Sequence, residues 1–270
     1  MEKFLIALDL DGTLLNNESQ LSNYTISTIN KLRDLGHVPV IATGRPYHAC
    51  IDFYYELNLD TPLISDNGGS IRFPHDESFV PIIKRIELDV AHELFKKSKP
   101  FLVSAFFSEG DVSYSYQDTS VLRKIFKENS KEVVHADFDQ LDIAPTGAIY
   151  LVATEYKDAF ERLIDSDFKG RVQYRFWGSD RKHAIYEFYV PGISKASALD
   201  YVAGLYGIDS NHIMAFGDGT NDLEMLSFAS HGVVMKNAFP DVVGHTSFVS
   251  EFDNDEDGVA KYLSNFFSIK

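Results

Sequence analysis

The sequence predicts an α/β protein in which a parallel-sheet core domain is interrupted by an inserted α+β domain. The chain opens with a continuous apolar run, Phe4–Leu8, typical of a strand buried on both faces of a parallel sheet. Strand-like and helix-like segments alternate up to about residue 80 and again beyond Pro191-Gly192, whereas strands rich in Tyr, Phe and β-branched residues lie between. We therefore expect a core domain of residues 1–83 and 188–270 and an inserted domain of residues 84–187.

The first part of the core reads as strand, helix, strand, helix, strand. In chain order we expect the strand Phe4–Leu8, a helix over 21–35, the strand Val38–Ala42, a helix after Pro46 and the short strand Pro62–Ser65. Apolar residues recur at helical spacing in the first helix, which Ser22 caps and Gly36 ends. This alternation is typical of a parallel sheet.

The inserted segment reads as an antiparallel sheet with helices on one face. We expect paired strands at Phe101–Phe107 and Val112–Tyr116, further strands near 147–153, 171–177 and 184–190, and helices near 119–129 and 156–165. Beyond it the α/β alternation resumes with a helix over 194–206, the strand Ile213–Phe216, a helix over 221–229, the strand His231–Met235 and a helix over 257–266.

The composition is that of a soluble globular protein, with 44% hydrophobic and 24% charged residues among 270. It excludes collagen-like, disulfide-rich and wholly disordered chains. The net charge of -15 disfavours nucleic acid and anionic membranes as partners, and a phosphorylated substrate would need local cations or a metal. Cys50 is the single cysteine, which fits a reducing compartment, and no run approaches the ~20 apolar residues of a membrane helix. We expect a soluble, cytoplasmic protein.

Carboxylates and glycines gather at the predicted ends of two core strands. Asp9 and Asp11 follow the first strand, where ligands bind in open α/β sheets, and Gly12 bends the chain after them. Two close carboxylates suit a hard cation, or a nucleophile beside a general acid–base. Asp218 and Asp222 follow the strand Ile213–Phe216, spaced so that a helix could orient both inward. Taken singly, each group could equally be a turn or an N-cap cluster.

Groups suited to phosphate stand at the same predicted edge. Thr43-Gly44 follows the second strand and opens a helix, where a hydroxyl and a helix N-terminus can bind phosphate oxygens, although an ordinary N-cap would look the same. Lys195 lies near the start of a helix, where its charge opposes the helix dipole, so it is a candidate for facing an anion rather than solvent. The four groups together point to phosphate and metal chemistry at one site.

These motifs resemble the four motifs of the haloacid dehalogenase-like hydrolases. The resemblance rests on Asp9-Leu10-Asp11-Gly12-Thr13-Leu14-Leu15, Ala42-Thr43-Gly44-Arg45-Pro46, Lys195 and Gly217-Asp218-Gly219-Thr220-Asn221-Asp222. Their spacing is similar to that of the Cof-type branch, subclass IIB, as is Ser65-Asp66-Asn67-Gly68-Gly69. The resemblance implies a Rossmann-like core with a parallel sheet and, between the second and third motifs, an inserted α+β cap domain of the C2 type that sets specificity.

The resemblance also implies a phosphatase that hydrolyses small phosphomonoesters, such as sugar, nucleotide or cofactor phosphates. Asp9 would be the nucleophile that forms a phospho-aspartyl intermediate, and Asp11 the general acid–base. Mg²⁺ would be held by Asp9, the main-chain carbonyl of Asp11 and Asp218, with Asp222 supporting the metal site. The phosphoryl oxygens would be bound by Thr43, Gly44, Lys195, Asn221 and the backbone around Leu10.

Two other functions remain compatible with the sequence. A phosphomutase would use the same intermediate but return the phosphoryl group to a sugar. A non-catalytic phospho-acceptor module also gathers aspartates and a lysine at a sheet edge, although the large insert and Asp11 argue against it. The sequence names no substrate, and we expect a monomer or weak homo-oligomer that binds a small phosphorylated metabolite.

Overall fold

The chain folds into two compact units, seen here in a computed structural model that describes residues 2–117 and 130–269. The first unit consists of Met1–Gly44, Cys50–Ile82 and Ser194–Lys270, and the second of Arg45–Ala49 and Ile83–Ile193. The predicted helix over 119–129 lies outside the described residues. Among the described helices, none combines the length and the apolar character needed to cross a membrane.

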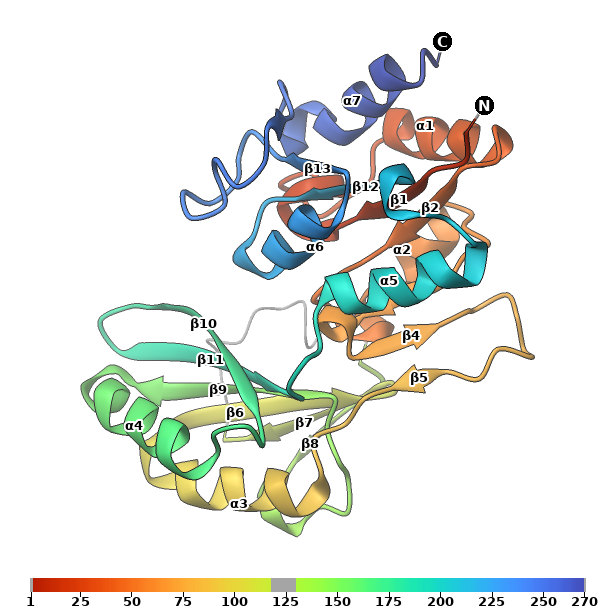
Figure 1. The fold of residues 1–270 in the computed structure, drawn as a ribbon. Coiled ribbons are helices and arrows are strands. Elements are labelled where there is room, and N and C mark those ends of the chain that lie inside the picture. Colours follow the sequence, from red (N-terminus) through yellow and green to blue (C-terminus); the bar gives the residue numbers. More distant parts are fainter. Residues whose placement is uncertain (1, 118–129, 270) are drawn as a thin grey trace. The chain divides into compact units, whose positions relative to one another are not determined.

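The first unit is built on a five-stranded parallel sheet with the strand order β14-β13-β12-β1-β2 (Figure 1). The strands are β1 (Leu5–Leu8), β2 (Val38–Ile41), β12 (Ile213–Gly217), β13 (His231–Val234) and β14 (Phe248–Val249). Every residue of β1, β2 and β12 is buried. The α/β prediction is confirmed, and the pairing of β1 with β12 shows that the core sheet resumes after the insert.

Helices cover both faces of this sheet (Figure 1). The helices of this unit are α1 (Asn23–Asp34), α2 (Ile51–Glu56), α5 (Lys195–Tyr206), α6 (Leu223–Phe228) and α7 (Gly258–Phe266). Leu199 of α5 and Leu226 of α6 share a buried apolar cluster with Leu5 and Ala7 of β1. On the opposite face the ring of Phe216 meets that of Tyr262 in α7. As predicted, the Ser22 side chain caps α1, accepting a hydrogen bond from the N–H of Thr25.

The third predicted strand of the core pairs differently from the expectation. β3 (Leu63–Ser65) runs antiparallel to β4 (Ser70–Arg72) and with β5 (Ile82–Ile83) forms a separate three-stranded sheet. It meets β2 only through a parallel bridge between Ala42 and Ile64. The reason is local: the backbone of residues 66–68 has positive φ and reverses the chain immediately after β3, so no crossover helix follows.

The second unit contains a six-stranded sheet with the order β10-β11-β9-β6-β7-β8. Its elements are α3 (Leu88–Ser98), β6 (Leu102–Glu109), β7 (Val112–Tyr116), β8 (Glu132–His135), β9 (Gly147–Ala153), α4 (Lys157–Asp167), β10 (Gln173–Ser179) and β11 (His183–Tyr189). The β6–β7 hairpin was predicted, but β8 pairs in parallel with β7, so the sheet is mixed rather than antiparallel.

The two described α-helices of the second unit, α3 and α4, pack on one face of its sheet; α4 corresponds to the predicted helix near 156–165. Leu94 and Phe95 of α3 and Phe160 of α4 join Tyr150 and Phe188 of the sheet in one buried cluster. Helix α3 was not predicted, although its apolar residues at 90, 94 and 95 have helical spacing. These residues come soon after the expected domain boundary at residue 83, and the first predicted strand of the insert begins only at Phe101.

Candidate active site

The register of the parallel sheet brings three turns to one edge. Leu8, the last residue of β1, pairs with Ile41 of β2 on one side and with Phe216 of β12 on the other. The chain segments that follow these strands therefore start side by side. They carry Asp9, Thr43 and Asp218, as expected for residues at the carboxyl ends of parallel strands.

The turn after β1 is wound so that Asp9 is fixed at the edge of the sheet. Its N–H donates to the carbonyl oxygen of Phe216 at 3.2 Å, and the N–H groups of Leu14 and Leu15 close the turn by donating to the carbonyls of Asp9 and Leu10. Within the turn Gly12 has φ +71°, a conformation that costs a residue with a side chain more than it costs glycine. Asp9 is 5% exposed.

Lys195 is fully buried and lies between two carboxylates. Its Nζ donates at 2.6 Å to Asp9 Oδ1 and at 2.6 Å to Asp222 Oδ1. The helix start that carries it is capped by Ser194, whose side chain accepts from the N–H of Ser197. The prediction that Lys195 faces anionic groups rather than solvent agrees with this geometry, since an ammonium group is almost never buried without a partner.

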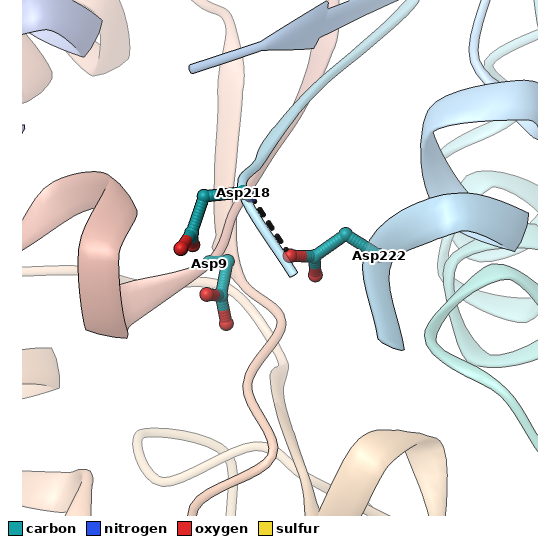
Figure 2. Close-up of side chains that lie close together, drawn as sticks. All are labelled: Asp9, Asp218 and Asp222. Carbon is teal, nitrogen blue, oxygen red and sulfur yellow. Dashed lines mark hydrogen bonds between the residues drawn. The ribbon is translucent and has the colours of Figure 1, made fainter. Parts of the chain in front are cut away.

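The second carboxylate oxygen of Asp222 organises the loop after β12. Oδ2 accepts from the backbone N–H of Asp218 at 3.1 Å, drawn in Figure 2, and from that of Gly219 at 2.9 Å. A Cβ on Gly217 would overlap the Asp222 side chain, so the close approach depends on glycine. Asp222 thus joins Lys195 to the backbone that presents Asp218, and both of its oxygens are engaged by the chain.

Asp218 is held by the turn that follows β1. The Thr13 hydroxyl donates to Asp218 Oδ1 at 2.9 Å. Gly12 lies so close that a Cβ there would overlap the Asp218 carboxylate. The Asn237 side chain in turn donates to the Gly12 carbonyl at 2.7 Å. Neither side chain was predicted from the sequence: Thr13 stands in the first motif without an assigned side-chain role, and Asn237 has no sequence signal that points to the site.

Asp9, Asp218 and Asp222 form the group that could hold a metal ion in the described part of the chain. Each offers a carboxylate oxygen, and the three oxygens lie within 4.8 Å of one another (Figure 2). All three residues are buried, with exposed fractions of 5%, 8% and 0%. A compact set of hard oxygen donors with a single ammonium group among them fits Mg²⁺, whose positive charge would offset the excess negative charge.

The pKa values reflect this excess of buried negative charge. Burial raises the pKa of Asp9 well above its usual range, with the Asp222 and Asp218 charges adding to the effect against the opposing Lys195. Burial, and then the charge of Asp222, raise the pKa of Asp218 to about 6. Burial acts to lower the pKa of Lys195, but the charges of Asp222 and Asp9 outweigh it and raise that pKa. A lysine so placed stays protonated.

The predicted phosphate-binding groups form a second cluster beside the carboxylates. Thr43 is buried, and its N–H donates to the Ile64 carbonyl at 3.0 Å. Next to it, Gly44 faces the side-chain amides of Asn67 and Asn221: a Cβ on Gly44 would lie 3.0 Å from Asn67 Oδ1 and 3.4 Å from Asn221 Nδ2. Asn221 directly precedes Asp222, so the two clusters are continuous along the chain.

Two predicted site residues, Asp11 and Leu10, lie outside the group formed by the carboxylates of Asp9, Asp218 and Asp222. The Asp11 side chain is half-buried and its carboxylate is not one of the three grouped oxygens, although its charge helps to raise the pKa of Asp218. The Leu10 side chain is fully buried, so this residue can offer a ligand only its backbone. The arrangement as a whole places a buried carboxylate, a fixed ammonium group and side-chain amides at one edge of the sheet.

Comparisons with known proteins agree with this chemistry. The family model for haloacid dehalogenase-like hydrolases matches residues 6–263. The 5-amino-6-(5-phospho-D-ribitylamino)uracil phosphatase YitU of Bacillus subtilis is 34% identical over 269 residues, which cover 98% of each chain. A haloacid dehalogenase-like hydrolase from Bacteroides thetaiotaomicron superposes with a TM-score of 0.83 at 25% identity, over 98% of this chain and 100% of that one.

The fold also matches that of the subclass IIB sugar phosphatase BT4131, with a TM-score of 0.81 at 22% identity over 99% of this chain and 100% of that one. Fold, family model and named relatives all point to the family that the four motifs predict. The chain is an enzyme of the haloacid dehalogenase-like hydrolases and has the fold of their subclass IIB.

Proposed function

We propose that the protein is a Mg²⁺-dependent phosphatase that hydrolyses small phosphomonoesters through a phospho-aspartyl intermediate on Asp9. The observation that carries the proposal is the buried contact between Asp9 and Lys195 beside a group of carboxylates that could hold a metal. Phosphoryl transfer depends mainly on positioning and on neutralising charge, and this arrangement supports both.

The two carboxylate oxygens of Asp9 have different roles in this proposal. Oδ1 is held by Lys195, so Oδ2 attacks phosphorus, and the bond between phosphorus and the ester oxygen breaks. Asp11 gives its proton to the leaving alkoxide. Asp11, now a carboxylate, takes a proton from a water molecule that attacks the aspartyl phosphate; this releases inorganic phosphate, frees the Asp9 carboxylate and returns Asp11 to its acid form.

The remaining residues hold the metal and the transferred group. Asp9, Asp218 and the main-chain carbonyl of Asp11 would hold Mg²⁺. Asp222 would support the site indirectly, by accepting hydrogen bonds from Lys195 and from the backbone N–H of Asp218. Bound there, Mg²⁺ would neutralise charge on the phosphoryl oxygens. Lys195, Asn221, Thr43, Gly44 and the Leu10 backbone would contact the same oxygens.

Replacing the nucleophile tests the central claim. Asp9→Asn should reduce turnover of p-nitrophenyl phosphate in Mg²⁺ to background, because an amide oxygen is a poor nucleophile. The circular dichroism spectrum should match that of the native protein. Asp34→Asn, the same change at an exposed residue at the end of α1, serves as control and should keep native rates. Native rates in Asp9→Asn would rule out the mechanism.

Gly12→Ala tests the metal-holding role of Asp218. The added methyl group would overlap the Asp218 carboxylate, so we expect the Mg²⁺ concentration for half-maximal activity to rise at least about tenfold. Gly36→Ala is the matched control, since Gly36 has φ +89° and, among the described residues, no atom within 4 Å of an added Cβ. Both variants carry backbone strain and only one disturbs the carboxylate. An equal shift in both would contradict the assignment.

Lys195→Met tests the charge balance of the buried group. It leaves Asp9 and Asp222 without their shared cation, so the free energy of unfolding in a metal chelator should fall by about 3–5 kcal/mol. Lys96→Met, at an exposed position of α3, should change it by less than about 0.5 kcal/mol. Denaturant unfolding of both variants measures the difference, and equal values would show that Lys195 does not balance these carboxylates.

The substrate is expected among small phosphorylated metabolites. YitU, at 34% identity, is named for its action on 5-amino-6-(5-phospho-D-ribitylamino)uracil, so this compound heads the screen, followed by sugar phosphates, nucleotides and pyridoxal phosphate. We expect phosphate release from one of these classes with Mg²⁺ and none with chelator. Isomerisation of a hexose phosphate without release of phosphate would favour a phosphomutase, and a phospho-protein stable for hours would favour a phospho-acceptor module.

A further inference from the structure

The loop between β3 and β4, residues 66–69, has no role in the mechanism above, yet it lies against the phosphate-binding groups. Its backbone is unusual: Asp66, Asn67 and Gly68 have φ values of +52°, +53° and +96°. Two consecutive non-glycine residues in the left-handed region are costly unless the surroundings fix them. Asn67, moreover, is 3% exposed, which is uncommon for an asparagine in a turn.

The backbone of Asn67 fixes the segment that carries Thr43 and Gly44. The N–H of Asn67 donates to the Thr43 carbonyl at 3.0 Å, and the N–H of Thr43 donates to the Ile64 carbonyl at 3.0 Å. These two bonds join the end of β2 to the end of β3, where only a single bridge pairs the strands. Thr43 therefore takes its position from this loop as well as from the parallel sheet.

The side chain of Asn67 fixes Asn221. Asn67 Oδ1 accepts from Asn221 Nδ2 at 2.9 Å across 154 residues of sequence. Gly44 lies against both amides, because a Cβ there would be 3.0 Å from Asn67 Oδ1 and 3.4 Å from Asn221 Nδ2. One N–H of the Asn221 amide is thus committed to Asn67, which sets the plane of the amide and the direction of the other N–H.

The same loop also contacts the start of α5. A Cβ on Gly68 would overlap the carbonyl oxygen of Ser194, the residue that caps the helix and precedes Lys195. Residues 66–69 therefore contact the three segments that carry Thr43, Lys195 and Asn221. Because these segments are far apart in the sequence, a shared contact is an effective way to fix their relative positions.

We propose that Asn67 is a positioning residue for phosphoryl transfer that acts by orienting the Asn221 amide toward the phosphoryl oxygens. This inference rests on the proposed function, which assigns Asn221 to the phosphate. An amide that a neighbour already holds in place need not reorient when the anion binds. A freely rotating amide would lose conformational entropy on binding, and it would first have to give up its hydrogen bonds to water. Asparagine suits the position because it tolerates the left-handed backbone and offers a carbonyl acceptor.

The test compares Asn67→Gly with Asn58→Gly. Glycine accepts a left-handed backbone, so Asn67→Gly removes the amide without adding strain. Asn58 has φ +54° and is exposed, so the same substitution there reproduces the backbone change away from the site. The measurements are kcat/KM for p-nitrophenyl phosphate and the inhibition constant of inorganic phosphate, with Mg²⁺ at saturation.

We expect Asn67→Gly to weaken phosphate inhibition by about tenfold, with a similar loss in kcat/KM, as for one hydrogen bond to a charged group. Asn58→Gly should match the native protein. Asn221→Ala should show a loss comparable to that of Asn67→Gly. In the double variant Asn67→Gly/Asn221→Ala the losses should not multiply, because Asn67 acts through Asn221. Losses that do multiply, or an Asn67→Gly variant equal to Asn58→Gly, would overturn the proposal.

If Asn67→Gly does not fold, Asn67→Asp takes its place in the cycle. Aspartate tolerates the same backbone and keeps an oxygen that accepts from Asn221. Asn221→Ala should then weaken phosphate inhibition by the same factor in the Asn67→Asp background as in the native protein, and a factor near one would overturn the proposal. A native protein inactive toward every phosphate ester would instead refute the proposed function, so the two failures are distinguishable.

Discussion

The site depends on one buried ammonium group. Lys195 is fully buried and donates to both Asp9 and Asp222, so Asp9 and the loop that presents Asp218 are held by the same nitrogen. Asp222 extends this connection through its other oxygen to the backbone of Asp218 and Gly219. A charge buried this deeply is stable only while its partners stay in place, so Asp9, Lys195 and Asp222 depend on one another. Burial raises the pKa of Asp9 well above its usual range, and the charges of Asp222 and Asp218 add to this effect.

The sheet and a few glycines make this arrangement possible. Parallel pairing of β1 with β2 and β12 aligns the ends of the three strands, so the turns that follow start at one edge. Gly12, Gly217 and Gly68 then allow approaches that a side chain would block, against Asp218, Asp222 and Ser194 respectively. The backbone therefore sets the positions of the segments that form the site, and the side chains make the contacts between them.

The sequence was sufficient to predict the α/β core, the inserted domain and the strand ends at which Asp9, Thr43 and Asp218 lie, because buried strands and helical spacing leave local signals. It could not predict the pairing of β3, which depends on the left-handed backbone at 66–68. The Thr13 and Asn67 side chains were missed for another reason: their partners, Asp218 and Asn221, are 205 and 154 residues away. Such contacts depend on packing and rotamers that no short motif encodes.

The pairing of β1 with β12 affects the order in which the two units can form during synthesis. Most of the second unit is one continuous stretch, Ile83–Ile193, so nearly all of it is synthesised before β12 and can begin to fold during synthesis. β1 emerges much earlier but has no β12 beside it until residues 213–217 are made. Asp9 is therefore synthesised long before most of the residues that surround it, and a chain terminated before residue 213 would lack β12, Asp218 and Asp222.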